Sequence, residues 1–277
     1  MQPNAAQTRE IHTTERAAPV GFCIYCGAKE KLTDEHVIPL ALGGNLILPK
    51  ASCNQKCNPI TSAFELKVLR GFMLEARTAA LFPTRRKKKR PSTLPLGLKR
   101  GDAFEEIALP PSESPGFLHL PTFARPAFLV GCPPVVGVTL IGMDTLYFGK
   151  RPDTVAESLG AETIRSAVSI DVNAFVRMLA KIAYSFAVAA FGPYPLIEVP
   201  VLPLILGTEN DGGTWVGSAD YTLALEARPG CQYSVGFVES LTSVDGHKEK
   251  ILVARLKLFA NAGATGYEVA VRRQRID

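Results

Sequence analysis

The residues with the clearest capacity for chemistry in this 277-residue chain lie in one short stretch, residues 23–58. The stretch reads CIYCGAKEKLTDEHVIPLALGGNLILPKASCNQKCN, in which two pairs of cysteines flank a single histidine, His36. Thiolates bind metal ions, and an imidazole exchanges protons near neutral pH. The segment could therefore have two functions. The cysteines could bind a metal that stabilises the fold, and the histidine could act on a substrate.

The cysteines have the spacing of zinc ligands. Two residues separate Cys23 from Cys26 and three separate Cys53 from Cys57, and positions i and i+4 share one face at the start of a helix. Four thiolates around one Zn²⁺ form a closed, structural site. We predict this structural zinc, with four reduced cysteines that bind no metal as the alternative. Disulfides are not expected, because residues 1–20 lack the apolar centre of a signal peptide, and we expect a cytoplasmic protein.

The histidine lies where two strands and a helix are expected to meet. Asp34 and Glu35 precede His36, and a proline and a double glycine follow it. The pattern predicts a strand that ends at His36, a loop, and a second strand from Asn45 that leads to the second cysteine pair. A helix should follow, with Asn58 just inside it. This order makes a cradle for one divalent ion beside an imidazole that can take a proton from water. A purely structural histidine is the alternative.

The stretch resembles the HNH endonuclease family, whose ββα-metal fold is often stabilised by two zinc-binding cysteine pairs. The resemblance covers residues 23 to about 70 and depends on the order CIYCG, DEHVIP, LGGN and SCNQKCN. It implies that His36 is the general base and that Asn45 orients it. It also implies that Glu35 and Asn58 ligate a catalytic Mg²⁺ or Mn²⁺, an ion able to neutralise charge on a scissile phosphate.

Positive charge is concentrated after this stretch. The net charge is +5 and the pI is about 8.9, and residues 85–90 read RRKKKR. Phosphate contacts give affinity with little sequence information, so we predict a nucleic-acid-binding strip that leads to His36, with a solvated linker as the alternative. The predicted contacts are Arg70, Arg77, Arg85, Arg86, Lys87, Lys88, Lys89 and Arg90. DNA is the expected partner, and the sequence does not distinguish DNA from RNA. It does not indicate an oligomeric state either.

Composition divides the chain into four zones. Residues 1–19 are expected to be a flexible arm, and residues 20–83 an HNH nuclease domain with its structural zinc and a helix that Pro83 ends. Residues 84–100 form a basic linker without periodicity, and residues 101–277 an α+β domain of unknown role, in substrate recognition or sensing. The predicted fold class is α+β: a small ββα-metal or treble-clef-like zinc domain plus a larger antiparallel-sheet domain packed on one long helix.

That long helix is expected at Val172–Phe191, between a capping Asp171 and Gly192. Because Arg177 and Lys181 interrupt its apolar face, we expect a core helix and no membrane span. Strands are expected around it at residues 127–132, 135–143, 145–150, 196–206, 221–227, 233–240, 251–260 and 267–273.

These features predict a metal-dependent endonuclease that hydrolyses DNA phosphodiester bonds, in a setting such as phage defence, restriction or a mobile element. The alternative is a zinc-knuckle protein that binds nucleic acid or a partner without catalysis. The set of Glu35, His36 and Asn58 favours catalysis, because a binding module does not require all three.

Overall fold

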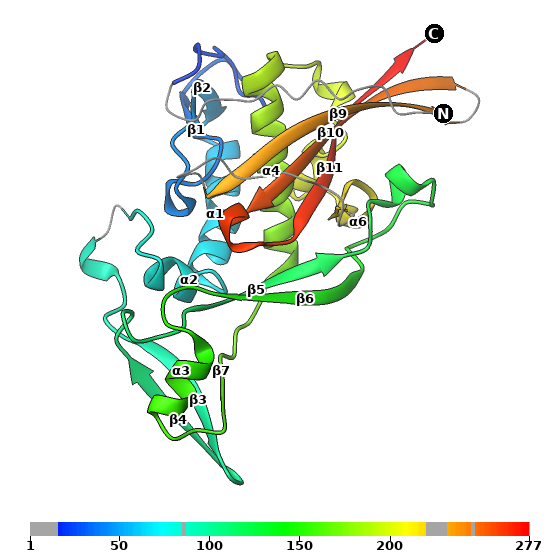
Figure 1. Ribbon diagram of the computed structural model, residues 1–277. Coiled ribbons are helices and arrows are strands. Elements are labelled where there is room, and N and C mark those ends of the chain that lie inside the picture. The colour runs from blue at the N-terminus through cyan, green and yellow to red at the C-terminus, as the bar shows by residue number, and fades with distance from the viewer. Residues whose placement is uncertain (1–15, 85–86, 220–231, 245–246, 277) are drawn as a thin grey trace.

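The fold of the chain is seen in a computed structural model that describes residues 16–84, 87–219, 232–244 and 247–276, and only the backbone of residues 87, 243 and 244. Most of the predicted N-terminal arm and the predicted strand at 221–227 lie outside these residues. The described part contains several antiparallel sheets, one of which packs on a single long helix (Figure 1), so the predicted α+β class is confirmed.

The N-terminal segment has the predicted order of strand, loop, strand and helix. Strand β1 (Leu32–His36) pairs antiparallel with β2 (Ile47–Cys53), and a 3-10 turn, η1 (Leu40–Leu42), lies in the loop between them. Helix α1 (Cys57–Arg70) follows. The loop requires Gly44, because a Cβ there would lie 2.4 Å from the carbonyl oxygen of Ile38.

The helical stretch after the cysteines is divided into two helices. Helix α1 ends at Arg70, and α2 (Leu74–Ala79) begins after a short break. Gly71 lies at the break, where a Cβ would come within 2.5 Å of the Lys67 carbonyl oxygen. Glycine is also a poor helix former. The break redirects α2 and its side chains relative to α1.

Helix α4 (Val172–Phe191) lies at the centre of the molecule, between α1 and a four-stranded antiparallel sheet (Figure 1). The strands of that sheet, in spatial order, are β8 (Val216–Ser218), β11 (Gly266–Ile276), β10 (His247–Leu258) and β9 (Tyr233–Val244). Buried residues of the cysteine segment, of α4 and of this sheet belong to one continuous hydrophobic core. The division into domains stays a prediction, but residues on both sides of the predicted linker share this core.

Of the described helices, α4 is the one with the length and composition of a membrane span. In its most apolar part, 78% of the residues are buried inside the protein, which is the environment of a core helix.

A smaller layer lies beyond α2 (Figure 1). It contains strands β4 (Ala103–Leu109), β3 (Leu94–Arg100) and β7 (Thr163–Arg165) in that spatial order, with helix α3 (Pro152–Ser158). Leu96, Leu98, Phe117 and Val155 form its own small core. The two-stranded ribbon of β5 (Phe117–Phe123) and β6 (Leu140–Tyr147) continues from this layer toward the main sheet.

The remaining short elements connect these layers. They are η2 (Lys87–Lys89), η3 (Ala127–Val130), η4 (Leu196–Glu198), α5 (Leu202–Leu206), α6 (Gly212–Trp215) and η5 (Ala260–Ala262).

Several strand predictions are confirmed and two are wrong. The segments predicted at 233–240, 251–260 and 267–273 lie largely in β9, β10 and β11, and those at 135–143 and 145–150 overlap β6. Residues 127–132 and 196–206 instead contain 3-10 turns and α5. Prolines explain both errors: Pro126 and Pro195 precede the turns and Pro203 lies in the first turn of α5, and proline cannot donate a hydrogen bond to a sheet.

One strand lies inside the predicted basic linker. In β3, the side chains of Leu94, Leu96 and Leu98 are buried, whereas the residues between them are exposed or half-buried. This is the two-residue period of a strand with one face on a core. The expectation that residues 84–100 lack periodicity is therefore wrong from Leu94 onward.

The start of α4 gives a first testable expectation. The Asp171 carboxylate accepts a hydrogen bond of 2.9 Å from the backbone N–H of Ala174, and this bond lowers the pKa of Asp171. Asp171→Ala should cost about 1 kcal/mol in the free energy of unfolding. Asp171→Asn, which retains a capping oxygen, should cost less. Urea denaturation at pH 7 measures both changes, and equal costs for the two variants would contradict the capping role.

Candidate functional site

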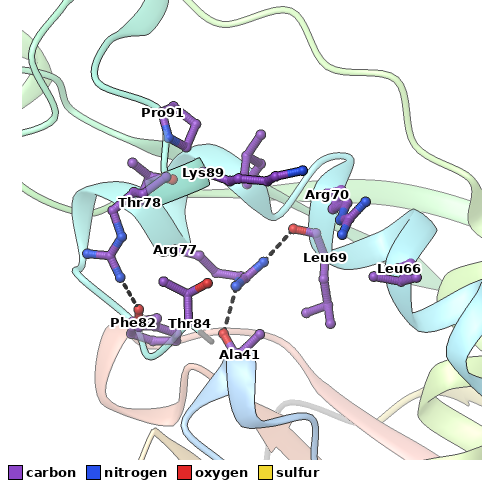
Figure 2. Close-up of a pocket in the computed structure, with 12 residues that line it drawn as sticks. Ala41, Leu66, Leu69, Arg70, Arg77, Thr78, Phe82, Thr84, Lys89 and Pro91 are labelled. Atoms are coloured by element: carbon purple, nitrogen blue, oxygen red, sulfur yellow. Dashed lines mark hydrogen bonds between the residues drawn. The ribbon is translucent and has the colours of Figure 1, made fainter. Parts of the chain in front are cut away.

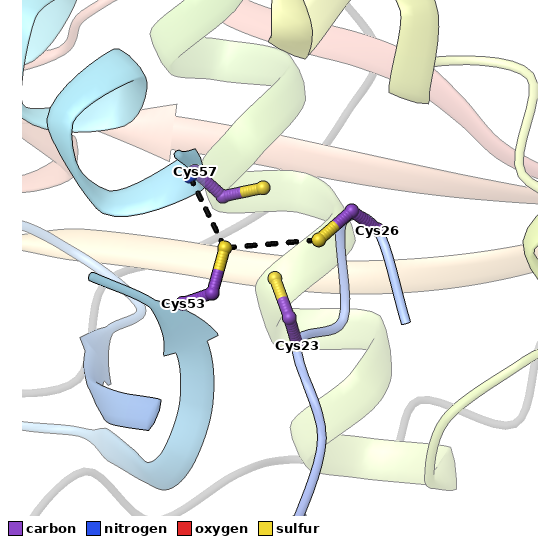
Figure 3. Close-up of side chains that lie close together, drawn as sticks. All are labelled: Cys23, Cys26, Cys53 and Cys57. Atoms are coloured by element: carbon purple, nitrogen blue, oxygen red, sulfur yellow. Dashed lines mark hydrogen bonds between the residues drawn. The ribbon is translucent and has the colours of Figure 1, made fainter. Parts of the chain in front are cut away.

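The four cysteines come together as predicted from their spacing. Their sulfur atoms all lie within 4.8 Å of one another (Figure 3), and Cys26 Sγ is 3.7 Å from Cys53 Sγ. Tetrahedral zinc with bonds of about 2.3 Å would separate its sulfurs by about 3.8 Å, so the cluster fits that ion. The residues present can therefore hold zinc.

Local structure explains how each pair reaches the cluster. The first pair lies on a tight turn in which the N–H of Gly27 donates to the carbonyl of Cys23 at 2.8 Å, with Gly27 at a φ of 77°. The second pair spans the end of β2 and the start of α1, where the N–H of Cys57 donates to Cys53 Sγ at 3.3 Å. The three-residue gap of the second pair is thus taken up by the turn into α1.

The sulfurs strongly influence one another's protonation. The Cys57 side chain hydrogen-bonds to the Cys23 sulfur and, as the largest cause, lowers the pKa of Cys23 to about 5. The same contact raises the pKa of Cys57, and burial raises the pKa of Cys26. A thiolate is thus favoured at Cys23 and disfavoured at Cys26 and Cys57, and a bound dication would displace the protons of these two thiols.

The turn that carries the first pair is bound to α4. The Tyr184 hydroxyl donates to the carbonyl of Ile24 at 2.8 Å, and the Tyr25 and Ser185 hydroxyls lie 3.1 Å apart. The rings of Tyr25 and Tyr184 meet edge to face with centroids 6.0 Å apart. Residues about 160 positions apart in the sequence therefore hold the cysteine cluster against the core.

Glu35 lies in a buried ion-pair cluster. Its carboxylate is only 4% exposed, and Lys181 Nζ of α4 lies 2.6 Å from its Oε1 atom. The same ammonium group lies 2.8 Å from Glu65 Oε1 and donates to the backbone carbonyl of His36. The ammonium is therefore paired with two carboxylates and bonded to a backbone carbonyl, although Glu65 Oε1 receives no hydrogen bond of ordinary geometry from the described residues.

The charge balance of this cluster bears on metal binding. Burial raises the pKa of Glu35, and the Lys181 ammonium opposes that change. The second oxygen, Oε2, receives no hydrogen bond of ordinary geometry from the described residues, and the Ser52 hydroxyl has a small lowering effect on the pKa of Glu35. Mg²⁺ usually keeps several waters, but Glu35 is buried and already paired with a cation. In this arrangement Glu35 does not fit a magnesium site, and its role as a metal ligand stays a prediction.

His36 lies at the end of β1, as expected, and is half-buried. Successive side chains of a strand point to opposite faces, so the inward direction of Glu35 places the imidazole on the other face of β1. Its backbone carbonyl is fixed by Lys181. The position of the histidine is thus set by β1 and by α4 together.

The two asparagines lie on the elements that were expected. Asn45 is exposed in the loop before β2, and Asn58 is half-buried in the first turn of α1, where its backbone carbonyl accepts from the Thr61 hydroxyl at 3.2 Å. Among the described residues, no hydrogen bond joins either asparagine side chain to the imidazole of His36. Their assignments, Asn45 as orienting group and Asn58 as metal ligand, stay predictions.

Of the predicted cationic contacts, four line one cavity (Figure 2): Arg70, Arg77, Lys89 and Arg90. Lys88 is exposed on η2 and does not line it. Arg85, Arg86 and the side chain of Lys87 lie outside the described residues. The predicted strip is therefore in part a concave site.

The sequence analysis did not predict that Lys181 and Glu65 form an ion-pair cluster with Glu35. A signal was present, because Lys181 interrupts an otherwise apolar helix, and a buried lysine requires an acidic partner. The identity of that partner was not readable, since Glu35 is 146 positions away and belongs to another element.

Comparison with known proteins identifies the class of the N-terminal segment. The model of a family described as HNH endonuclease matches residues 23–67, so this segment is of the HNH endonuclease family, as the resemblance indicated. The match covers the cysteine cluster, β1, β2 and most of α1. No curated protein and no solved structure matches the chain.

Proposed function

We propose that this protein is an endonuclease that hydrolyses phosphodiester bonds of DNA in the cytoplasm, with His36 as the general base. One observation supports the proposal. In the segment that matches the HNH family, a half-buried histidine lies at the end of β1, in a β1–loop–β2–α1 unit that contains the cysteine cluster. An imidazole at that position can accept the proton of an attacking water near neutral pH. Phosphates would be contacted by Arg70 of α1, Arg77 of α2 and the lysines of η2.

Two kinds of metal belong to this proposal. The four cysteines would hold Zn²⁺, which stabilises the segment that carries His36. The family resemblance also implies a catalytic Mg²⁺ or Mn²⁺, whose contribution would be to neutralise phosphate charge. Because Glu35 is already paired with Lys181, the proposed chemical role of this segment is proton removal by His36.

A plasmid assay tests the proposal. Purified protein with supercoiled plasmid should produce nicked or linear DNA, with Mg²⁺ and Mn²⁺ added in separate reactions. His36→Ala should reduce the rate by about 10²–10⁴-fold, the usual contribution of a general base. His247→Ala is the matched control, because His247 is an exposed histidine at the start of β10.

A loss of cleavage in the His36 variant counts only if that variant keeps the zinc content and the circular dichroism of the wild type. Equal cleavage by the His36→Ala and His247→Ala proteins would remove His36 from the mechanism.

The second candidate function is a zinc module that binds nucleic acid without cleaving it. The ion pair between Glu35 and Lys181 favours this candidate, because it occupies the carboxylate that the family resemblance assigns to a metal. Plasmid that stays intact with every divalent ion tested, yet shifts on a gel, would establish this function in place of catalysis.

A further inference from the structure

A cavity of about 420 Å³ opens between α1, α2 and residues 82–84 and 89–91 (Figure 2). We call it the α1–α2 pocket. Its size is within the range of sites that bind small ligands. It adjoins the loop after His36, because Arg77 Nε of α2 donates to the carbonyl of Ala41 in η1 at 2.6 Å.

The polar lining of the α1–α2 pocket is cationic. Four basic residues line it, and none of the described lining residues is acidic. Arg70 and Lys89 form no ion pair among the described residues, and Figure 2 shows both side chains among those that line the pocket. Such uncompensated charge favours an anionic ligand.

Two of the guanidinium groups are held in place by backbone carbonyls. Arg77 donates to Ala41 and, through Nη1, to the carbonyl of Leu69 at 2.6 Å, which leaves N–H donors of its fork available. Arg90 donates to the carbonyl of Phe82. Burial, and then the charge of Arg90, lower the pKa of Arg77 to about 10, and no acidic residue is among the described residues that line the pocket with these two cations. A phosphate oxygen would relieve that repulsion and accept the remaining donors.

The rest of the pocket lining is largely apolar. Leu66 is 45% exposed at its rim, and Leu69 and Leu74 line its wall. Phe82 completes this wall, with its ring stacked on Phe259 at a centroid distance of 5.6 Å. A ligand with an anionic end and a flat apolar part would contact both kinds of lining residue, whereas a bare inorganic anion would leave the apolar residues uncovered.

We propose that the α1–α2 pocket binds a single nucleotide unit, with its phosphate on the basic residues and its base against the leucine side chains. The unit has two sources: a free mononucleotide, or one nucleotide of a single strand that continues toward His36. Binding itself does not depend on cleavage, and only the second source rests on the proposed function.

Binding is measured with the full chain in the absence of added divalent ions, so that it is separate from catalysis. Calorimetry with dTMP, AMP and inorganic phosphate tests the free nucleotide, and fluorescence anisotropy of a labelled dT12 oligonucleotide tests the strand. The variant is Arg70→Ala with Lys89→Ala, two side chains that make no described hydrogen bond. The control is Lys67→Ala with Lys150→Ala, which removes the same charge outside the pocket.

For the bound probe we expect about 10-fold weaker affinity for each pocket cation removed, and little change in the control. If the wild type binds dTMP or AMP and the pocket variant does not, the ligand of the pocket is a free nucleotide. If only dT12 binds, the pocket variant should also lower the salt dependence by about 1.4 in log–log slope, which identifies the strand. Three results would each overturn the proposal. They are equal affinities of the pocket and control variants, no binding of any probe, and inorganic phosphate that binds as tightly as dTMP.

Discussion

Replacement of Cys57 by serine should remove zinc from the protein and unfold the cysteine segment. Structural zinc contributes on the order of 10 kcal/mol of binding free energy to small zinc domains, and this becomes folding free energy. The cluster anchors the end of β2, the start of α1 and the turn that packs on Tyr184 of α4. We expect about one zinc per wild-type chain, much less in Cys57→Ser, and a melting temperature lower by about 10 °C or more.

The matched control for this change is Cys132→Ser, because Cys132 is an exposed cysteine away from the cluster. Elemental analysis by mass spectrometry gives the zinc content, and circular dichroism gives the melting temperature. A wild-type protein purified without zinc, or a Cys57→Ser protein as stable as Cys132→Ser, would contradict the structural zinc.

The parts of the site that the sequence predicts are those formed by local interactions. The cysteine spacing, the strand ending at His36 and the helix beginning before Asn58 all depend on residues that are close in the chain. Turn geometry, ligand number and strand periodicity act over such short distances. The same logic predicts α4, whose apolar face and capping Asp171 are contained in one segment.

The parts that the sequence does not predict depend on tertiary contacts. The break at Gly71 places Arg77 against Ala41 and forms a pocket where a linear strip was expected. Likewise, the burial of Glu35 depends on Lys181, and the pairing of two residues so distant in sequence carries no local pattern. Burial decides whether a carboxylate is available to a metal, so the role of an acid in a motif cannot be read from the motif alone.

The Lys181 ammonium gives the last prediction. Lys181→Met retains the size and apolar stem of the side chain but leaves Glu35 and Glu65 without their cation. Removal of one partner from a buried ion pair typically costs about 3–5 kcal/mol in the free energy of unfolding, and we expect a loss of this size at pH 7. Guanidinium denaturation with fluorescence detection measures it, and Arg177→Met, which changes another half-buried cation of α4, is the control.

The loss should depend on pH in a definite direction. Burial raises the pKa of Glu35 in the folded protein, and removal of Lys181 should raise it further, because the ammonium opposes that rise. A carboxyl group with a raised pKa in the folded state binds its proton more tightly there than in the unfolded chain. Stability of the variant should therefore fall as pH rises through that pKa and recover as pH is lowered toward the ordinary value of 4.5.

A combined variant separates lost charge pairing from lost packing. Addition of Glu35→Gln and Glu65→Gln to Lys181→Met removes the uncompensated carboxylates, and it should restore much of the stability at pH 7, since buried ion pairs are often replaceable as a set. A deficit that is equal at pH 5 and pH 7, or that the glutamines do not reduce, would show that Lys181 acts through packing alone. Recovery would instead establish that α4 fixes the strand that carries His36 through a buried charge.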